Sequence, residues 1–220
     1  MCRFVAVISK TPFDTEKYMD MLKHQARYGE KAPHKDGWGA YLRTENGDIL
    51  HKETVPVWLS GATFPRSYIL MAHARKKGRG AKVAICNTHP FVCGDAVFMH
   101  NGLIKIEKHP LAKGDTDSES AFLTLLSSDL DEFKKRLKTF AETHEYRALN
   151  FVMLYDAKLI VVRSANANED YYSIYFKRDG DRIVISTELE DGEVIENHTG
   201  MVIDENLNLR KWNIFSDKPR

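Results

Sequence analysis

The spacing of hydrophobic residues changes along the chain, and each change predicts a different element. Residues 4–8 are a continuous apolar run, which is typical of a buried strand, and residues 11–14 break it. In residues 15–28 the apolar side chains recur at helical spacing, and Gly29 ends the predicted helix. The chain therefore opens as a buried strand followed by an amphipathic helix.

The rest of the chain is predicted to be rich in short strands, with two helices in one block. Thr116 and Glu119 form a capping box, as do Asp129 and Glu132, and an apolar stripe follows each box. Because strands and helices do not alternate, the pattern favours a layered α+β fold over a parallel βαβ sheet. Strands are expected at residues 40–44, 49–54, 68–72, 96–99, 149–155, 159–163, 172–177, 182–187, 201–204 and 209–214.

Composition and charge narrow the function classes. Of the 220 residues, 43% are hydrophobic and 29% are charged, and the net charge of +1 gives no basis for a nucleic-acid or membrane partner. No apolar run approaches the ~20 residues that span a bilayer, and the N-terminus lacks the features of a signal peptide. Three cysteines make no disulfide framework. We therefore expect a reduced, cytoplasmic protein with one domain over residues 1–220.

Cys2 is the first candidate for chemistry, because removal of Met1 would make it the amino-terminal residue. It would then carry both a thiol and an α-amine, whose unperturbed pKa of about 7.7–8.0 leaves a good fraction neutral at cellular pH. Such an amine can take the proton of its own thiol and activate it as a nucleophile. The alternative is that Cys2 is a small buried hydrophobic residue beside a strand.

Three further positions are candidates by residue type and place. Arg75, after a buried strand, presents a fork suited to a carboxylate, although its lysine neighbours also fit a solvated basic loop. In His100-Asn101-Gly102, an amide side chain and a glycine N–H at a strand end meet the needs of an oxyanion hole, while Asn-Gly is also a common turn. Asp117, in the first turn of a helix, suits the helix dipole and is equally able to bind an ammonium group.

The sequence does not indicate metal or phosphate chemistry. Cys86 and Cys93, with His89 and His100 between and beyond them, match none of the usual zinc-ligand spacings. No phosphate-binding glycine motif is present, and a nucleic-acid role would rest only on the basic loop at residues 76–79. We expect no metal, no cofactor and no nucleic-acid partner.

Five motifs follow one another along the chain: Met1-Cys2, His73-x-Arg75, Asn87-x-His89-Pro90, His100-Asn101-Gly102 and Thr116-Asp117-Ser118-Glu119. Their order resembles that of the class II glutamine amidotransferases, whose glutaminase domains use an amino-terminal nucleophile. A further stretch, Asp36-Gly37-Trp38-Gly39, is similar to the compact stand-alone branch of that family. The resemblance implies a four-layer αββα sandwich with two antiparallel sheets between layers of helices.

The resemblance also implies a role for each motif residue. Cys2 would attack the side-chain amide of glutamine with its own α-amine as general base, and Asn101 and Gly102 would form the oxyanion hole. Arg75 would hold the substrate α-carboxylate and Asp117 its α-ammonium group. A γ-glutamyl thioester on Cys2 would then be hydrolysed to glutamate. Residues that would support the site from behind are His73, His89, His100 and Trp38.

Two departures from the family pattern leave alternatives open. Lys76-Lys77-Gly78 replaces the aromatic residue, Ala and Thr that often follow the arginine, so a threonine that would help to bind the carboxylate is missing. No acceptor or synthase domain is expected, so ammonia would pass to a separate synthase or be released. The alternatives are an amidase for another γ-glutamyl compound and a non-catalytic, partner-binding domain.

Overall fold

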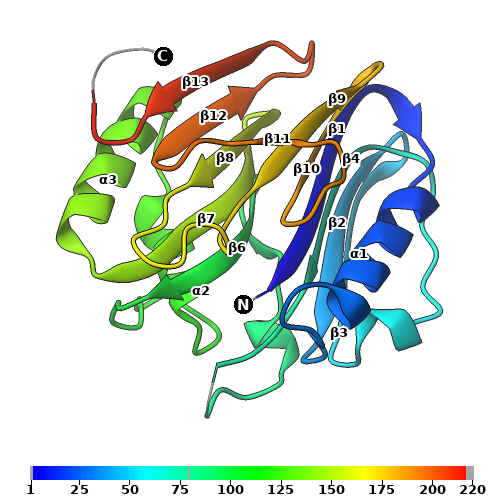
Figure 1. Ribbon diagram of the computed structural model, residues 1–220, viewed down its shortest axis with the longest axis horizontal. Coiled ribbons are helices and arrows are strands. Elements are labelled where there is room, and N and C mark those ends of the chain that lie inside the picture. Colours follow the sequence, from blue (N-terminus) through cyan, green and yellow to red (C-terminus); the bar gives the residue numbers. More distant parts are fainter. Residues whose placement is uncertain (1, 79, 217–220) are drawn as a thin grey trace.

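The chain folds into two β-sheets packed face to face, with helices on both outer faces (Figure 1). The structure is a computed structural model and describes residues 2–78 and 80–216. Its helices are α1 (Glu16–Tyr28), α2 (Asp117–Leu125) and α3 (Leu130–Thr143), with 3-10 turns at Val57–Leu59 and Ile85–Asn87. Its strands are β1 (Arg3–Phe13), β2 (Trp38–Thr44), β3 (Gly47–Glu53), β4 (Ser67–Ala74), β5 (Phe91–Cys93), β6 (Ala96–Ile104), β7 (Tyr146–Tyr155), β8 (Lys158–Arg163), β9 (Tyr175–Asp179), β10 (Arg182–Ser186), β11 (Glu193–Val194), β12 (Thr199–Ile203) and β13 (Leu209–Asn213).

The two sheets are antiparallel throughout their named pairs and enclose the central core. The first has the order β11-β9-β10-β1-β4-β2-β3, and the second has the order β13-β12-β8-β7-β6-β5. One apolar layer lies between the sheets, a second lies under α1, and a third lies under α2 and α3. The predicted αββα arrangement is therefore confirmed.

Strand β1 shows why a continuous apolar run builds this sandwich. Phe4, Ala6 and Ile8 point into the core between the sheets, whereas Val5 and Val7 point into the layer under α1. All five side chains are at most 2% exposed. A strand that is covered on both faces needs apolar residues at every position, and each large side chain buried in this way contributes about 1.5–3 kcal/mol.

Several strand boundaries differ from the expected ones. β1 runs through residues 11–13 to Phe13, because its pairing with β4 shifts after Ile8 and resumes at Ser67. β6 continues to Ile104 instead of ending at residue 99, because β7 pairs with it along its length. The Asn-Gly pair of the oxyanion-hole motif therefore lies inside a strand and not at its end. Residues 172–174, expected in a strand, precede β9.

Both predicted helix starts are confirmed by their caps. The Thr116 hydroxyl accepts a hydrogen bond from the backbone N–H of Glu119 at 3.2 Å, and Asp129 accepts from the N–H of Glu132 at 2.9 Å. Glu119 does not bond back to Thr116. Its carboxylate instead accepts from the backbone of Gly114 at 2.7 Å and so fixes the loop before α2.

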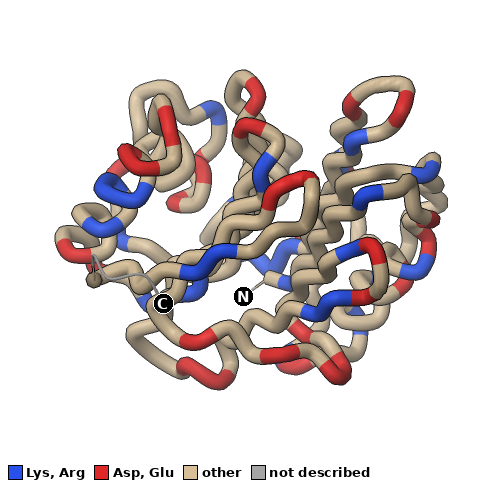
Figure 2. The backbone as a smooth tube through the Cα atoms, turned by 90° about the horizontal axis from the view of Figure 1, so that it is seen from above, with Lys and Arg blue, Asp and Glu red and all other residues tan. Residues whose placement is uncertain are grey.

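The surface carries both signs of charge side by side, and no single-sign face stands out from above the molecule (Figure 2). This distribution agrees with the net charge of +1. Among the described residues, no helix is long and apolar enough to cross a membrane.

Candidate active site

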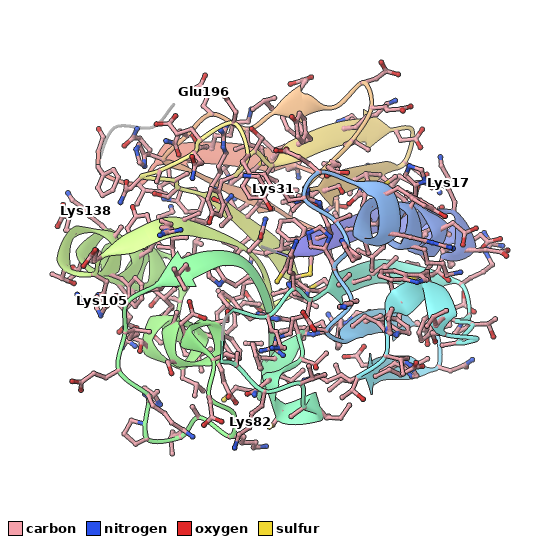
Figure 3. The ribbon with its side chains drawn as sticks, turned by 60° about the horizontal axis from the view of Figure 1, so that its bottom comes forward. Lys17, Lys31, Lys82, Lys105, Lys138 and Glu196 are labelled. Carbon is pink, nitrogen blue, oxygen red and sulfur yellow. The ribbon has the colours of Figure 1, made fainter. Side chains whose placement is uncertain are left out.

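Cys2 lies at the start of β1, where loops from both sheets meet. Its thiol faces the backbone carbonyl of Lys76 at 3.9 Å, in the loop that follows β4. The loop after α1 approaches from another side, and the ammonium group of Lys76 donates to the carbonyl of Lys31. Seen from this end of the molecule, Lys31 lies near the start of β1, and Lys82 marks the far end of the loop after β4 (Figure 3). Cys2 is half-buried and is thus held between these loops.

Asn101 is the direct partner of Cys2. The backbone nitrogen of Cys2 donates to Oδ1 of Asn101 at 2.9 Å, and Asn101 is only 1% exposed. Because the side-chain oxygen faces Cys2, the amide nitrogen Nδ2 points elsewhere, and it is buried with no hydrogen-bond partner among the described residues. Buried donors are almost always paired, so an unpaired donor on the residue that binds Cys2 is a candidate for a ligand contact.

Gly102 follows Asn101 at a point where two strands approach closely. A Cβ atom on Gly102 would lie 1.8 Å from the carbonyl oxygen of Ala148, so no other residue fits without moving β7. Successive residues of an antiparallel strand turn their N–H groups to opposite sides, so residues i and i+2 direct them to the same edge. The N–H of Ile104 faces away from β7 and donates to Asp117 at 2.8 Å. The N–H of Gly102 therefore faces the same edge.

Arg75 is a buried cation. It is 4% exposed, its guanidinium donates to the carbonyl of Lys82 at 2.9 Å, and its backbone bonds to Gly37 and Asp36. It makes no ion pair with the described residues. A buried charge without a counterion is costly, so its planar fork is a candidate for binding an anion.

The Asp117 carboxylate is held in a fixed orientation. It accepts hydrogen bonds from the N–H of Ile104 at 2.8 Å and of Ser118 at 2.9 Å. Burial raises the pKa of the Cys2 thiol, and the nearby charges of Arg75 and Asp117 respectively lower and raise it. Both charges therefore act on the thiol. The five residues predicted to form the site are brought to one end of the sandwich.

The three predicted supporting histidines lie directly behind Asn101. Nε2 of His73 donates to the carbonyl of His100 at 3.1 Å, and the rings of His73 and His89 are tilted by 31° with centroids 4.1 Å apart. Burial lowers the pKa of all three, that of His73 to about 3, so they are neutral near pH 7. Trp38 lies apart from them, in the apolar layer under α1 against Phe64, where it has a packing role.

Several neighbours of Cys2 were not predicted. Arg3 and Tyr171 are close to each other, with the guanidinium carbon 5.6 Å from the ring centroid. Burial raises the pKa of Tyr171 and Tyr172, and the charge of Cys2 adds to this rise. Burial, followed by the charge of Arg3, lowers the pKa of His34 to about 3. His34, Tyr171 and Tyr172 come from loops with no periodic pattern, and Arg3 is a charged residue at the start of β1, so the sequence carries little signal for them.

The described residues hold no group of three or more His, Cys, Asp or Glu side chains arranged for a metal ion. The arrangement at Cys2 is instead a thiol beside buried hydrogen-bond donors, a cation and a carboxylate. Such a set can bind a zwitterionic small molecule and stabilise an anionic intermediate.

Comparison with solved structures shows the fold. The glutamine phosphoribosylpyrophosphate amidotransferase of B. subtilis matches 99% of this chain and 50% of its own, with a TM-score of 0.67 and 13% identity. A glutamine aminotransferase class-II domain protein from Silicibacter pomeroyi matches 96% of this chain and 99% of its own, with a TM-score of 0.65 and 17% identity. The fold is therefore that of the N-terminal-nucleophile hydrolases, as expected.

Comparison of sequences shows the family. YafJ from Escherichia coli (strain K12) is 29% identical over an alignment of 165 positions, which covers 67% of this chain. The chain spans 63% of the length of that relative. A family model described as class-II glutamine amidotransferases matches residues 1–152. The chain therefore belongs to the class II glutamine amidotransferases.

Proposed function

We propose that this protein hydrolyses the side-chain amide of glutamine to glutamate and ammonia, with Cys2 as the amino-terminal nucleophile. The observation that carries the proposal is the position of Asn101, whose oxygen holds the backbone nitrogen of Cys2 at 2.9 Å. Its buried amide nitrogen is left to serve a ligand. Acyl transfer requires a nucleophile and a hydrogen-bond donor for the oxyanion, and the residue that binds Cys2 carries an unpaired donor.

The first chemical step would be attack of the thiol on the amide carbon. After removal of Met1, the nitrogen of Cys2 is a primary α-amine, and it would take the thiol proton directly or through water. A sulfur–carbon bond forms, and the carbonyl π electrons move to the oxygen. Nδ2 of Asn101 and the N–H of Gly102 would stabilise that oxyanion, and each such donor is typically worth about 10²–10³ in rate.

The second half of the reaction would release both products. The α-ammonium group gives its proton to the leaving nitrogen, the carbon–nitrogen bond breaks, and ammonia departs. This leaves a γ-glutamyl thioester on Cys2. Water then attacks the thioester with the same amine as base, and glutamate leaves as the thiol is regenerated.

Recognition of a free amino acid would come from two opposite charges. The guanidinium of Arg75 would pair with the α-carboxylate, and Asp117 would pair with the α-ammonium group. Arg75 is buried without an acidic partner among the described residues, so the substrate carboxylate would supply the missing counterion. A peptide-bound glutamine lacks both charges and would be rejected.

The fate of the ammonia and the choice of amide are part of the same proposal. We propose a separate ammonia-accepting synthase as partner, with residues 1–220 forming one glutaminase domain. The loop at residues 76–78 departs from the family pattern, and this favours one alternative, an amide of another γ-glutamyl compound. The site requires no cofactor for this chemistry.

The decisive experiment measures glutamate release from glutamine by Met1-free protein, verified by intact mass, with Cys2→Ser as the matched control. Turnover that disappears in the control, together with a γ-glutamyl adduct trapped on Cys2, supports the glutaminase. A panel of γ-glutamyl amides run in parallel tests the substrate. If neither glutamine nor the panel is hydrolysed while Cys2 is intact, the proposal is wrong.

A further inference from the structure

Arg3, the residue next to Cys2, is buried, and its guanidinium group lies close to the backbone of Cys2. It is 1% exposed, and one guanidinium nitrogen lies 3.5 Å from the carbonyl oxygen of Cys2. The other lies 2.5 Å from the carbonyl oxygen of Glu30 and 2.6 Å from the carboxylate of Glu188. A charged side chain at this depth is rare unless it is paired. The contacts of Arg3 with Cys2 and Glu188 therefore suggest a role for this buried cation at the site.

Contacts with residues 29 and 30 hold Glu188, the counterion of Arg3, in place. Glu188 follows β10, and its carboxylate also accepts from the N–H of Glu30 at 2.9 Å. A Cβ atom on Gly29 would lie 2.5 Å and 2.8 Å from the two carboxylate oxygens, so glycine at this position makes room for the ion pair. The ion pair thus joins the start of β1, the end of α1 and the end of β10.

We propose that Arg3 is a positioning residue for the amino-terminal nucleophile: it anchors the start of β1 and places a positive charge beside the Cys2 amine and thiol, where Glu188 limits its strength. This inference rests on the proposed function for its catalytic meaning. The predicted effect of Arg3 on the ionisation of Cys2 does not depend on the substrate.

The distance between the charge and the amine follows from covalent geometry. Three bonds separate the Cys2 nitrogen from its carbonyl oxygen, so the nitrogen is at most about 8 Å from the guanidinium. At that range one unit charge changes an ionisation by about half a pH unit in a partly solvated site. A cation disfavours the ammonium form of the amine and favours the thiolate, so both effects raise the reactive fraction at neutral pH.

The positive charge of Arg3 also shifts the pKa values of neighbouring groups. The charge of Arg3 is the second-largest cause, after burial, of the lowered pKa of His34, and it opposes the rise that burial imposes on Tyr171. The other titratable or charged groups around Cys2 come from three more segments and are present in every variant. They are Arg75, Lys76, Asp117 and Tyr172.

The test measures how the alkylation rate of Cys2 by iodoacetamide depends on pH in Met1-free protein. The exposed Cys86 and Cys93 are replaced by serine so that only Cys2 reacts. Arg3→Met removes the cation, and the apparent midpoint is expected to rise by about half a pH unit. Glu188→Gln removes the anion, and the midpoint is expected to fall by a similar amount. Arg3→Lys keeps the charge, so its midpoint should remain close to that of the parent.

Alkylation midpoints that shift in opposite directions in Arg3→Met and Glu188→Gln indicate an effect of charge. A merely structural role would change the alkylation rate of both variants without separating their midpoints. If Arg3→Met does not fold, judged by circular dichroism, Glu188→Gln and Arg3→Lys still decide the matter. Midpoints that coincide in the folded variants, or that move in the same direction, overturn the inference. Opposite shifts in a protein that hydrolyses no γ-glutamyl amide uphold the inference and reject the proposed function, so the two failures are distinguishable.

Discussion

The hydroxyl oxygen of Ser118 lies 2.9 Å from Nδ1 of His100, and this contact links the ammonium-binding side of the site to the oxyanion strand. Nε2 of His100 lies 3.3 Å from the carbonyl oxygen of Ala148, which only accepts, so the ring proton is on Nε2. Nδ1 must then accept the proton of Ser118. The same hydroxyl lies 3.3 Å from Oδ1 of Asp117, a longer contact than the one to His100, and its one proton cannot be donated to both. Donation to His100 leaves the Asp117 carboxylate available to a ligand.

Replacing Ser118 by alanine is expected to lower both the stability of the protein and its activity. The buried Nδ1 of His100 loses its donor, which costs about 1–3 kcal/mol of unfolding free energy. The freed imidazole no longer fixes the strand before Asn101, and we expect kcat/KM for glutamine to fall about tenfold, the equivalent of about 1.4 kcal/mol. Urea denaturation and steady-state kinetics measure the two effects.

Ser118→Thr is the matched control, because it keeps the hydroxyl. It should retain most of the stability and activity. The interpretation fails if threonine and alanine variants lose activity equally, since the hydroxyl would then have no part in the effect.

Gly102→Ala should lower activity at least about 10²-fold while leaving most of the fold intact. The added methyl group would lie 1.8 Å from the Ala148 carbonyl oxygen, so β6 or β7 must move by more than ~1 Å. A displacement of that size at a reacting centre can cost about 10²-fold in rate. We expect a loss of about 1–3 kcal/mol in stability and at least that drop in kcat.

The control for this substitution is Gly61→Ala, where an added Cβ atom meets nothing within 4 Å. It should leave both thermal unfolding and turnover unchanged. Glutaminase activity in Gly102→Ala within tenfold of the parent would show that this close approach does not govern the site.

Local patterns in the sequence predicted the layers of the fold because its strands are buried on both faces. The run from Phe4 to Ile8 reads as a strand without any knowledge of its partners. The end of β6 could not be predicted in the same way, since it depends on pairing with β7, a strand more than 40 residues away in the chain. Long-range pairing therefore carried Asn101 into a strand where a strand end was expected.

The candidate site was predictable only where residue type and motif order coincide. Cys2, Arg75 and Asp117 are brought together as the motifs suggested, although their roles remain proposals. Arg3 and Tyr171 could not be found this way. Arg3 reads as an ordinary charged residue in a strand, and its burial depends on Glu188, which lies 185 residues further along the chain. Nothing in the local sequence reports such a partner.

The buried histidines should make the protein less stable as the pH falls. Burial lowers the pKa of His73 from 6.5 to about 3, so the folded chain excludes a proton that the unfolded chain binds. The stabilising contribution is complete above pH ~6.5 and declines towards pH ~3, with a slope of about 1.4 kcal/mol per pH unit for one histidine. Urea denaturation between pH 4.5 and pH 7.5, at roughly half-unit steps, measures the total slope.

His73→Gln isolates one contribution, because its amide can still donate to the His100 carbonyl. The slope of unfolding free energy against pH should decrease by about one proton relative to the parent. An unchanged slope would mean that His73 titrates alike in both states, contrary to its burial at 0% exposure.

Arg75→Lys should impair binding more than chemistry. A lysine keeps the charge but loses the fork that suits a carboxylate, and we expect KM for glutamine to rise about 10–100-fold with a smaller change in kcat. The comparison substrate is 4-aminobutanamide, which is glutamine without the α-carboxylate. Its kcat/KM should be nearly equal in parent and variant, and an equal loss on both substrates would show that Arg75 acts elsewhere.

Asn101 offers the sharpest separation of roles, because its two side-chain atoms face different partners. Asn101→Asp keeps an acceptor for the Cys2 nitrogen and removes the Nδ2 donor, whereas Asn101→Ala removes both. Negative charge on the substrate oxygen develops only in the transition state, so loss of the donor should lower kcat by about 10²–10³ with little change in KM. We expect this loss in both variants.

Alkylation of Cys2 then tells the two variants apart. The aspartate variant should still hold the chain end and react with iodoacetamide at a single pH-dependent rate, while the alanine variant should react faster and less selectively because its chain end is released. Turnover by Asn101→Asp within tenfold of the parent would mean that the oxyanion is stabilised by other donors. In that case the buried Nδ2 group would need a different explanation, because an unpaired donor at this depth costs about 1–3 kcal/mol of stability.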